Sequence, residues 1–294
     1  MDNYKISLLQ LNLNGDRNTN LAKAKEYITE AASNGANVIC LPELYSSFYF
    51  CQRENPDYYN FAEPQNDVSF KEFSLLAKQL GAVIIVPFFE KRDRGVYHNS
   101  AYMIDADGSK AGLYRKMHIP DDPCYYEKYY FNPGDLGFKA FDNKFGRQGI
   151  LICWDQWFPE AARLTAMQGA EVLFYPTAIG WHPSEKGEEG DRQREAWITV
   201  QRGHAVANGL YVASVNRVGF ERHETTDESG IDFWGSSFIA GPQGEIIAQA
   251  STNKEEILYA DIDLARIETV RRNWPFFRDR RTDFYGGLLE KWGR

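Results

Sequence analysis

Apolar patterns of helical spacing and of strand length alternate along this chain of 294 residues, and the alternation limits the folds open to it. Apolar residues recur at helical spacing over residues 21–31, a glycine stop follows, and residues 38–41 form a short apolar run. The same order returns in a predicted helix over 70–80 and a predicted strand over 82–88. Repeated units of this kind predict a layered α/β fold rather than separate α and β domains.

The second half of the chain continues the pattern. We expect a hairpin around Asp107-Gly108, strands over 149–153, 172–175 and 211–215, and helices over 159–168 and from about 195 to 208. Residues 118–138 and 180–194 break the rhythm, and long irregular segments inside compact domains are often functional. The sequence has no Ser/Gly/Pro-rich linker and no internal repeat, so we expect one domain over residues 1–294.

Charge and cysteine usage narrow the class of partner. The formal net charge is −8 and the pI is near 5.3, which argues against nucleic acid or an anionic membrane as the main partner, because both need a basic surface. No stretch approaches the ~20 apolar residues that span a bilayer, and the amino-terminal apolar run is too short for an export signal. Four cysteines and five histidines are scattered without ligand spacing. We therefore expect free thiols in a cytoplasmic protein, with no metal site readable from the spacing.

One cysteine stands at the exit of a predicted buried strand. Cys153 ends the apolar run over 149–153 and precedes a helix that opens at Pro159. A nucleophile in this position faces the crevice at the carboxyl end of the strand, where backbone N–H groups also meet a developing oxyanion. A buried structural cysteine is the alternative interpretation of the same residue.

Two charged residues also end predicted strands. Glu43 follows the apolar run over 38–41 after a proline that prevents further central pairing, and it would serve equally well as a residue that opens a helix. Lys116 ends the second strand of the predicted hairpin, at a place where a lysine is usually a solvated surface residue. Taken singly, none of these residues fixes a function.

Taken together, these residues resemble the Glu–Lys–Cys set of the nitrilase, or carbon–nitrogen hydrolase, superfamily. The motifs stand in the family's order, and they are Leu41-Pro42-Glu43-Leu44, Tyr114-Arg115-Lys116-Met117-His118-Ile119-Pro120 and Ile152-Cys153-Trp154-Asp155-Gln156-Trp157-Phe158-Pro159-Glu160. The resemblance runs from the first strand to the segment 277–281, so it covers nearly the whole chain. It implies a four-layer α-β-β-α sandwich, in which helices cover two central sheets.

The resemblance also implies roles for four residues. Cys153 would be the covalent nucleophile, Glu43 the base that takes the thiol proton, and Lys116 the cation that stabilises the oxyanion with the backbone N–H of Trp154. A second family glutamate matches Glu127, which would hold Lys116 and the substrate nitrogen; a surface residue in a Tyr-rich loop is the alternative. Activation is needed because a free thiol is only a few per cent thiolate near neutrality. The implied mechanism requires no metal and no organic cofactor.

Further segments, 125–135, 176–180 and 201–205, resemble the branch of the superfamily that acts on monocarbamoylated diamines in polyamine synthesis. The distal ammonium of such a substrate needs a carboxylate or aromatic faces, whereas a substrate with a distal carboxylate needs arginine. The candidate aromatic walls are Tyr49, Tyr125, Tyr126, Trp154 and Trp181, and the candidate acids are Asp121, Asp122, Glu185, Glu188 and Glu189. We predict Glu188 as the partner of the ammonium. Arg192 and Arg194 keep the carboxylate alternative open.

Other assignments remain open at this level. One alternative is a β-ureidopropionase-like or ω-amidase-like hydrolase of the same superfamily. Another is a catalytically inactive member that acts as a binding module, but the presence of all four residues argues against it, because an inactive member need not retain them. Family members usually pair. The mixture of aromatic residues and arginines over about 270–294 is consistent with an interface, and equally with packing on the chain's own domain. We expect a homo-oligomer of two or more copies.

Overall fold

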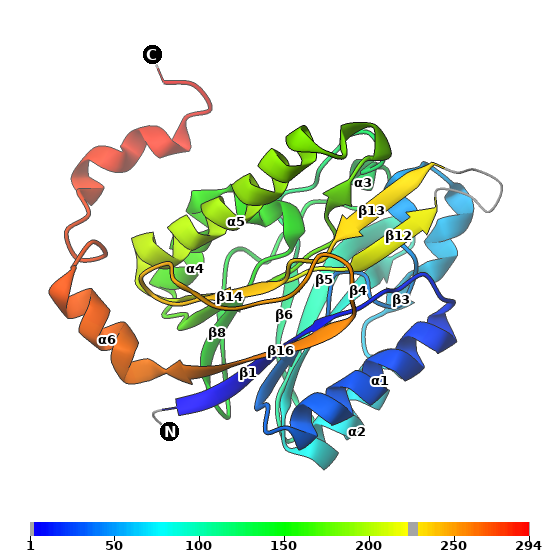
Figure 1. Cartoon of the computed structure of the whole chain (residues 1–294), viewed down its shortest axis with the longest axis horizontal. Helices are drawn as coiled ribbons and strands as arrows, with labels where there is room; N and C mark the ends of the chain where they lie inside the picture. Colours follow the sequence, from blue (N-terminus) through cyan, green and yellow to red (C-terminus); the bar gives the residue numbers. More distant parts are fainter. Residues whose placement is uncertain (1–2, 223–228, 294) are drawn as a thin grey trace.

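The computed structural model describes residues 3–222 and 229–293, and most of its strands belong to two sheets stacked face to face (Figure 1). The larger sheet has the order β16-β1-β2-β4-β5-β6, with β3 paired to β4. Its strands are β1 (Asn3–Gln10), β2 (Val38–Cys40), β3 (Glu63–Pro64), β4 (Val83–Asp93), β5 (Val96–Ile104), β6 (Lys110–Arg115) and β16 (Glu256–Asp263).

The second sheet has the order β15-β14-β11-β9-β8-β7, and a small third sheet has the order β10-β13-β12. The strands of the second sheet are β7 (Ala140–Asn143), β8 (Gly146–Ile150), β9 (Val172–Pro176), β11 (Tyr211–Val215), β14 (Phe238–Ala240) and β15 (Ile246–Gln249). Those of the third are β10 (Gly180–Trp181), β12 (Val218–Arg222) and β13 (Gly230–Trp234).

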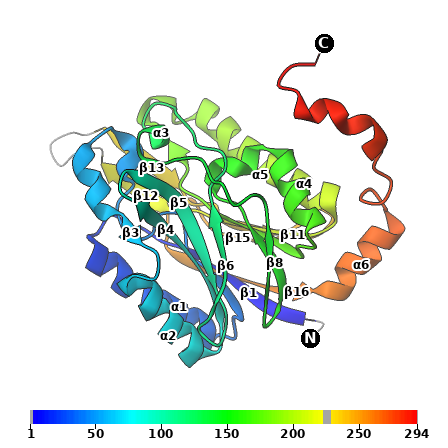
Figure 2. The same cartoon turned by 180° about the vertical axis from the view of Figure 1, so that it is seen from behind.

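Helices cover the outer faces of both large sheets. Helices α1 (Arg17–Ser33) and α2 (Val68–Leu80) lie on one side of the molecule, and α4 (Pro159–Met167) and α5 (Glu188–Asn208) lie on the opposite side (Figures 1 and 2). The remaining helices are α3 (Glu127–Tyr130), α6 (Leu264–Asn273) and the 3₁₀ helices Phe50–Gln52, Pro56–Phe61, Cys153–Trp157, Pro183–Glu185 and Thr282–Leu289. The predicted four-layer α-β-β-α sandwich is confirmed.

Side-chain alternation along the strands explains the layers. In β2, Val38 and Cys40 belong to the core between the sheets, whereas Ile39 packs against Ala24 and Ile28 of α1. Because strands of this kind are buried on both faces, they read in the sequence as continuous apolar runs. The carboxylate of Asp16 accepts a hydrogen bond from the backbone N of Thr19 at 2.8 Å and so caps α1.

The direction of the strands determines where the site lies. Strands β1, β2 and β4 run parallel in one sheet, and β8, β9 and β11 run parallel in the other. Strand β6 runs antiparallel to β5, which is antiparallel to β4, so β6 points the same way as β4. In open α/β sheets, ligands bind outside the carboxyl ends of the strands.

Several predicted elements are confirmed, although some of their limits differ, and β4 for example extends to Asp93. The strand over 211–215 coincides with β11, and the predicted hairpin is the antiparallel pair β5–β6. The strand predicted over 149–153 ends instead at Ile150. The helix predicted from about residue 195 begins at Glu188, inside the segment expected to be irregular. Its first turn lacks an apolar period, and Glu188 and Glu189 suit the positive end of the helix dipole.

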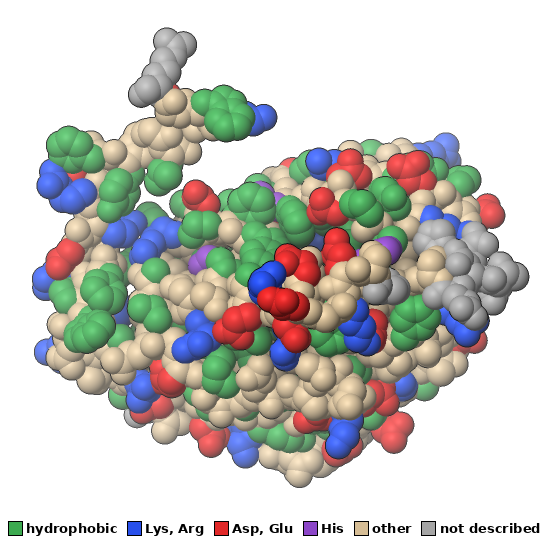
Figure 3. Space-filling model, turned by 45° about the horizontal axis from the view of Figure 1, so that its top comes forward, with side chains coloured by type: hydrophobic (Ala, Val, Ile, Leu, Met, Phe, Trp, Pro, Cys, Tyr) green, Lys and Arg blue, Asp and Glu red, His purple; other side chains and the backbone are tan. Residues whose placement is uncertain are grey.

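The carboxyl-terminal segment departs from the sandwich. After α6 the chain runs through the 3₁₀ helix Thr282–Leu289 and ends away from the body of the molecule (Figure 1). Figure 3 shows apolar side chains on this projecting segment. No helix in residues 3–222 and 229–293 has the length and apolar character needed to cross a membrane.

Candidate active site

Three elements of the two sheets deliver Glu43, Lys116 and Cys153 to one end of the sandwich. Glu43 follows β2, Lys116 immediately follows β6, and Cys153 follows β8. The chain leaves the second sheet after Ile150 because it turns into the 3₁₀ helix Cys153–Trp157. At Cys153 the φ angle is 43°, a left-handed value that a residue with a side chain rarely adopts. Strained backbone of this kind clusters at functional sites.

A fully buried ammonium joins two carboxylates at the centre of the site. The Nζ of Lys116 donates to Oε1 of Glu43 at 2.8 Å and to Oε2 of Glu127 at 2.6 Å. The Nδ2 of Asn99 donates to the same Oε1 of Glu43 at 2.7 Å, and the hydroxyl of Tyr49 donates to Oε1 of Glu127 at 2.8 Å. The other oxygen of Glu43, Oε2, has no hydrogen-bond partner among the described residues.

Burial and charge set the proton positions in this cluster. Burial, opposed by the charge of Lys116 and reinforced by that of Glu127, raises the pKa of the Glu43 carboxyl to about 7. Burial acts to lower the pKa of Lys116, but the charges of Glu127 and Glu43 outweigh it and hold that pKa well above its usual range. Burial and the nearby charge of Glu43 raise the pKa of the Cys153 thiol well above its usual range. The resting thiol is therefore protonated and needs a base.

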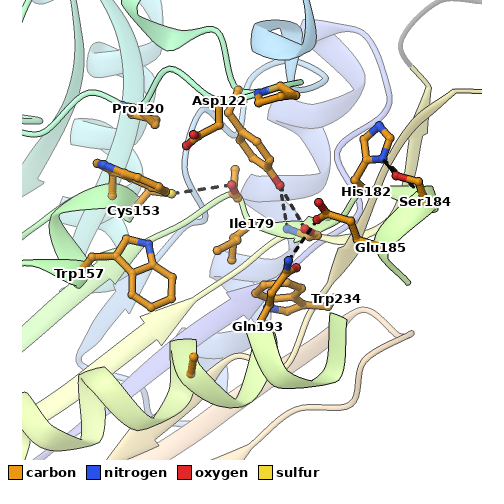
Figure 4. A pocket seen from close by; sticks show the side chains of 16 residues that line it. Pro120, Asp122, Cys153, Trp157, Ile179, His182, Ser184, Glu185, Gln193 and Trp234 are labelled. Carbon is orange, nitrogen blue, oxygen red and sulfur yellow. Dashed lines mark hydrogen bonds between the residues drawn. The ribbon is translucent and has the colours of Figure 1, made fainter. Parts of the chain in front are cut away.

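Cys153 lies in the wall of a cavity of about 620 Å³ (Figure 4). Its Sγ contacts the carbonyl oxygen of Ala178 at 3.7 Å, and it is close enough to Glu43, Lys116 and Glu127 for their charges to act on it. The cavity is lined by Pro120, Asp122, Pro123, Tyr125, Cys153, Trp154, Trp157, Ala178, Ile179, Gly180, His182, Ser184, Glu185, Gln193, Ala196 and Trp234. Among these described lining residues there are two acids and no lysine or arginine.

The two acids differ in how they are held. Glu185 accepts a hydrogen bond from Nε2 of Gln193 at 3.1 Å, and it lies across the cavity from Cys153, on the side of His182 (Figure 4). Asp122 belongs to the loop that follows Lys116 and is exposed. A cation that enters the cavity therefore meets carboxylates, while the aromatic rings of Trp154, Trp157 and Trp234 form apolar wall.

The structure does not bring every predicted binding residue to this cavity. Glu188 lies in the first turn of α5, its side chain is 82% exposed, and it pairs with Arg192 on the same helix. Tyr126 is absent from the lining, and the buried hydroxyl of Tyr49 faces Glu127 rather than the cavity. Trp154 does line the cavity. The preference for Glu188 is corrected because the helix starts there and turns that side chain to the surface.

Two polar residues of the site escaped the sequence analysis. Asn99 lies inside β5, where nothing in the apolar pattern separates it from an ordinary strand residue. Asp155 is fully buried two positions after Cys153, and its carboxylate accepts four hydrogen bonds. Its position inside the cysteine motif was the signal available. Within the described residues, no cluster of three or more His, Cys, Asp or Glu side chains is arranged to hold a metal ion.

The sandwich and its buried Glu–Lys–Glu cluster beside a cysteine define an enzyme class, the hydrolases of the nitrilase superfamily. The chain belongs to the carbon–nitrogen hydrolase family, whose sequence profile matches residues 5–272. It is similar to the N-carbamoylputrescine amidase of Arabidopsis thaliana, with 49% identity over 286 residues that cover 97% of this chain and 94% of the plant protein.

Two other relatives cover the whole length. The citrullinase of Francisella tularensis is 44% identical over 293 residues, which are 99% of this chain and 100% of that protein. The crystal structure of a carbon–nitrogen hydrolase from Helicobacter pylori superposes with a TM-score of 0.95 at 48% identity, and the match covers 99% of this chain and 100% of that one.

Proposed function

We propose that this protein hydrolyses N-carbamoylputrescine to putrescine, ammonia and carbon dioxide, as a step of polyamine biosynthesis. One observation supports this choice of substrate: next to Cys153 lies a cavity whose described lining residues include Asp122 and Glu185 but no lysine or arginine. A diamine carbamoylated at one end carries an ammonium at the other, and carboxylates are the groups that receive it. The similarity to the plant amidase over nearly the full chain supports the same substrate.

In the proposed reaction, Cys153 attacks the ureido carbon and its thiol proton passes to Glu43. The acceptor is Oε2, the oxygen of Glu43 without a hydrogen-bond partner in the described part of the chain. The negative charge that develops on the ureido oxygen is stabilised by the ammonium of Lys116 and by the backbone N–H of Trp154. Glu127 fixes Lys116 through the 2.6 Å bond.

The covalent intermediate forms by loss of one nitrogen and is then hydrolysed. Collapse of the tetrahedral adduct breaks one C–N bond, and Glu43 returns its proton to the departing nitrogen. Glu43 next deprotonates a water molecule, which attacks the carbonyl carbon bound to Cys153 and releases the thiol. In either order of nitrogen departure, this step yields a carbamic acid, which decomposes to carbon dioxide and the second amine.

Citrulline is the second candidate substrate, because the chain is also similar to a citrullinase over its whole length. Citrulline has the same ureido group, but its distal end carries a carboxylate as well as an ammonium. A buried carboxylate without a cationic partner is costly. The described lining of the cavity offers it acids rather than arginine, so we propose the diamine.

A substrate panel scored by ammonia release tests the assignment. We expect carbamoylputrescine to be turned over with a higher kcat/KM than citrulline, carbamoyl-β-alanine and simple ω-amides. The Cys153→Ala variant, assayed beside the wild-type protein, controls for contaminating hydrolases. Preference for citrulline or carbamoyl-β-alanine would overturn the cationic substrate, and activity in Cys153→Ala would overturn the nucleophile.

We also propose that the chain is a single hydrolase domain whose tail, about residues 270–294, contacts a second copy in the cytoplasm. The tail exposes large apolar side chains, namely Trp274, Phe276, Phe284, Tyr285, Leu288, Leu289 and Trp292. Leu289 and Trp292 are 93% and 79% exposed, an arrangement that is unfavourable in water and typical of a surface that a partner covers. The four free cysteines are compatible with a reducing compartment.

A further inference from the structure

The carboxylate of Asp155 joins two segments that lie 37 residues apart in the sequence. Its Oδ1 accepts hydrogen bonds from the backbone N of His118 at 3.0 Å and from the ring Nδ1 of His118 at 2.7 Å. Its Oδ2 accepts from the hydroxyl of Tyr114 at 2.8 Å and from the backbone N of Ile152 at 2.9 Å. Asp155 is fully buried, and its bonds from Tyr114 and Ile152 lie in the interior, a medium where hydrogen bonds are strong.

These four donors bracket two reactive groups. Tyr114 and His118 stand two positions before and after Lys116, and Ile152 immediately precedes Cys153. Two of the bonds hold backbone N–H groups, those of His118 and Ile152, and two hold the side chains of Tyr114 and His118, so all four fix residues that flank Lys116 or Cys153 in the chain. The bond to Ile152 also closes the turn in which Cys153 adopts its left-handed φ of 43°. A strained conformation persists only where its surroundings hold it.

The orientation of His118 is itself fixed. Its ring lies flat on that of Phe158, with centroids 3.7 Å apart and planes inclined by 5°, and this contact aims Nδ1 at Asp155. Asp155 does not line the cavity, so its carboxylate does not meet the substrate. Its contacts are those of a group that acts through its neighbours.

We infer that Asp155 is a positioning residue that ties the end of β6, with Lys116, to the turn that carries Cys153. Its four hydrogen bonds hold the ammonium and the thiol in the relative position at which both reach one substrate carbonyl. The inference rests on the proposed function, in which those two groups act together, and it adds a residue outside the Glu43, Lys116, Glu127 and Cys153 cluster. Misplacement of reacting groups by about 1 Å costs about 10²-fold in rate.

The Asp155→Asn variant tests this role. An amide has one acceptor oxygen and two N–H donors, so it cannot accept from all four groups that the carboxylate serves. We expect kcat to fall by about 10²-fold while KM stays close to wild type, because the cavity that binds the substrate is unchanged. Alkylation of Cys153 by iodoacetamide should slow with kcat. The alkylation uses no carbamoyl substrate, so it remains informative even if the proposed substrate is wrong.

A matched pair of tyrosine variants distinguishes a positioning role of the Asp155 hydrogen bonds from an effect of side-chain packing alone. Tyr114→Phe removes one donor to Asp155, whereas Tyr175→Phe removes a buried hydroxyl that lies within the electrostatic reach of Asp155 and has no hydrogen-bond partner in residues 3–222 and 229–293. We expect kcat to fall about tenfold in the first variant and to stay at wild type in the second. Combined with Asp155→Asn, the Tyr114→Phe change should cost less than it does alone, because both changes disrupt the same hydrogen-bond network.

Several outcomes would overturn the inference. Wild-type kcat and alkylation rate in a folded Asp155→Asn or Tyr114→Phe variant would show that the bonds do not matter for the chemistry. Equal losses in Tyr114→Phe and Tyr175→Phe would assign the effect to packing alone. If Asp155→Asn does not fold, the tyrosine pair decides the question by itself.

Discussion

The two oxygens of Glu43 have different environments, and this difference leaves one oxygen available to accept a proton. Oε1 is held by Lys116 and Asn99, whereas Oε2 has no partner among the described residues. In Glu43→Gln the side chain keeps its size but cannot accept the thiol proton. We expect kcat to fall by at least about 10²-fold, the usual contribution of a positioned base. A folded variant, verified by its circular dichroism, that retains near-wild-type turnover would remove Glu43 from this role.

The pKa of Glu43 sets the acid limb of the pH profile. Burial raises this pKa to about 7, and only the ionised carboxylate accepts a proton. We therefore expect kcat/KM to fall as the pH drops below about 7, measured from about pH 5 to pH 9. The charge of Glu127 contributes to the raised pKa, so Glu127→Gln should shift the acid limb to lower pH as well as reduce the rate. A shift toward higher pH would contradict this electrostatic account.

At the scale of elements, the junction between β10 and α5 decides which carboxylate faces the cavity. The chain passes from Gly180–Trp181 through the 3₁₀ helix Pro183–Glu185 into α5. A Cβ on Gly190 would lie 2.4 Å from the Trp181 ring, so this close approach requires glycine. The junction places Glu185 and Gln193 at the cavity and leaves Glu188 and Glu189 on the surface.

A pair of glutamate variants tests that junction. Glu185→Gln removes a cavity carboxylate, and we expect KM for carbamoylputrescine to rise about tenfold with a smaller change in kcat, because a contact to the distal ammonium is lost. Glu189→Gln changes an exposed residue that pairs with Arg192, so it serves as the matched control and should leave both constants unchanged. Steady-state kinetics on both variants show whether the loss of the Glu185 carboxylate raises KM. An unchanged KM in Glu185→Gln would contradict this contact and would leave Asp122 as the cavity carboxylate that binds the distal ammonium.

At the scale of the whole molecule, the projecting tail predicts an assembly. We expect light scattering to give the mass of a dimer or a larger oligomer at micromolar concentration. Replacement of Leu289 and Trp292 by serine should lower that mass, because it removes the most exposed apolar contacts. Leu75→Ser is the matched control, since Leu75 is an exposed leucine on α2 outside the tail. A monomeric wild-type protein would refute the proposal.

The sequence by itself determined the alternation of helices and strands and the order of the reactive residues. The apolar run over 211–215 predicts strand β11 at its observed limits, because a run buried on both faces leaves a local signature. The predicted end of the helix at residue 80 is also observed, and Gly81 closes α2 with a left-handed φ of 65°. The motifs also indicated which glutamate, lysine and cysteine to look for. Periodicity failed where polar residues form structure, as in the first turn of α5.

Only the tertiary structure decided how these groups face one another. It turned Glu188 to the surface and Glu185 to the cavity, and it left one oxygen of Glu43 without a hydrogen-bond partner among the described residues. It also brought donors from residues 114–118 to Asp155, beside that of Ile152. The physical reason is that each contact depends on the directions of side chains that meet only after both sheets have stacked. Such directions depend on packing between segments, which a local sequence pattern does not encode.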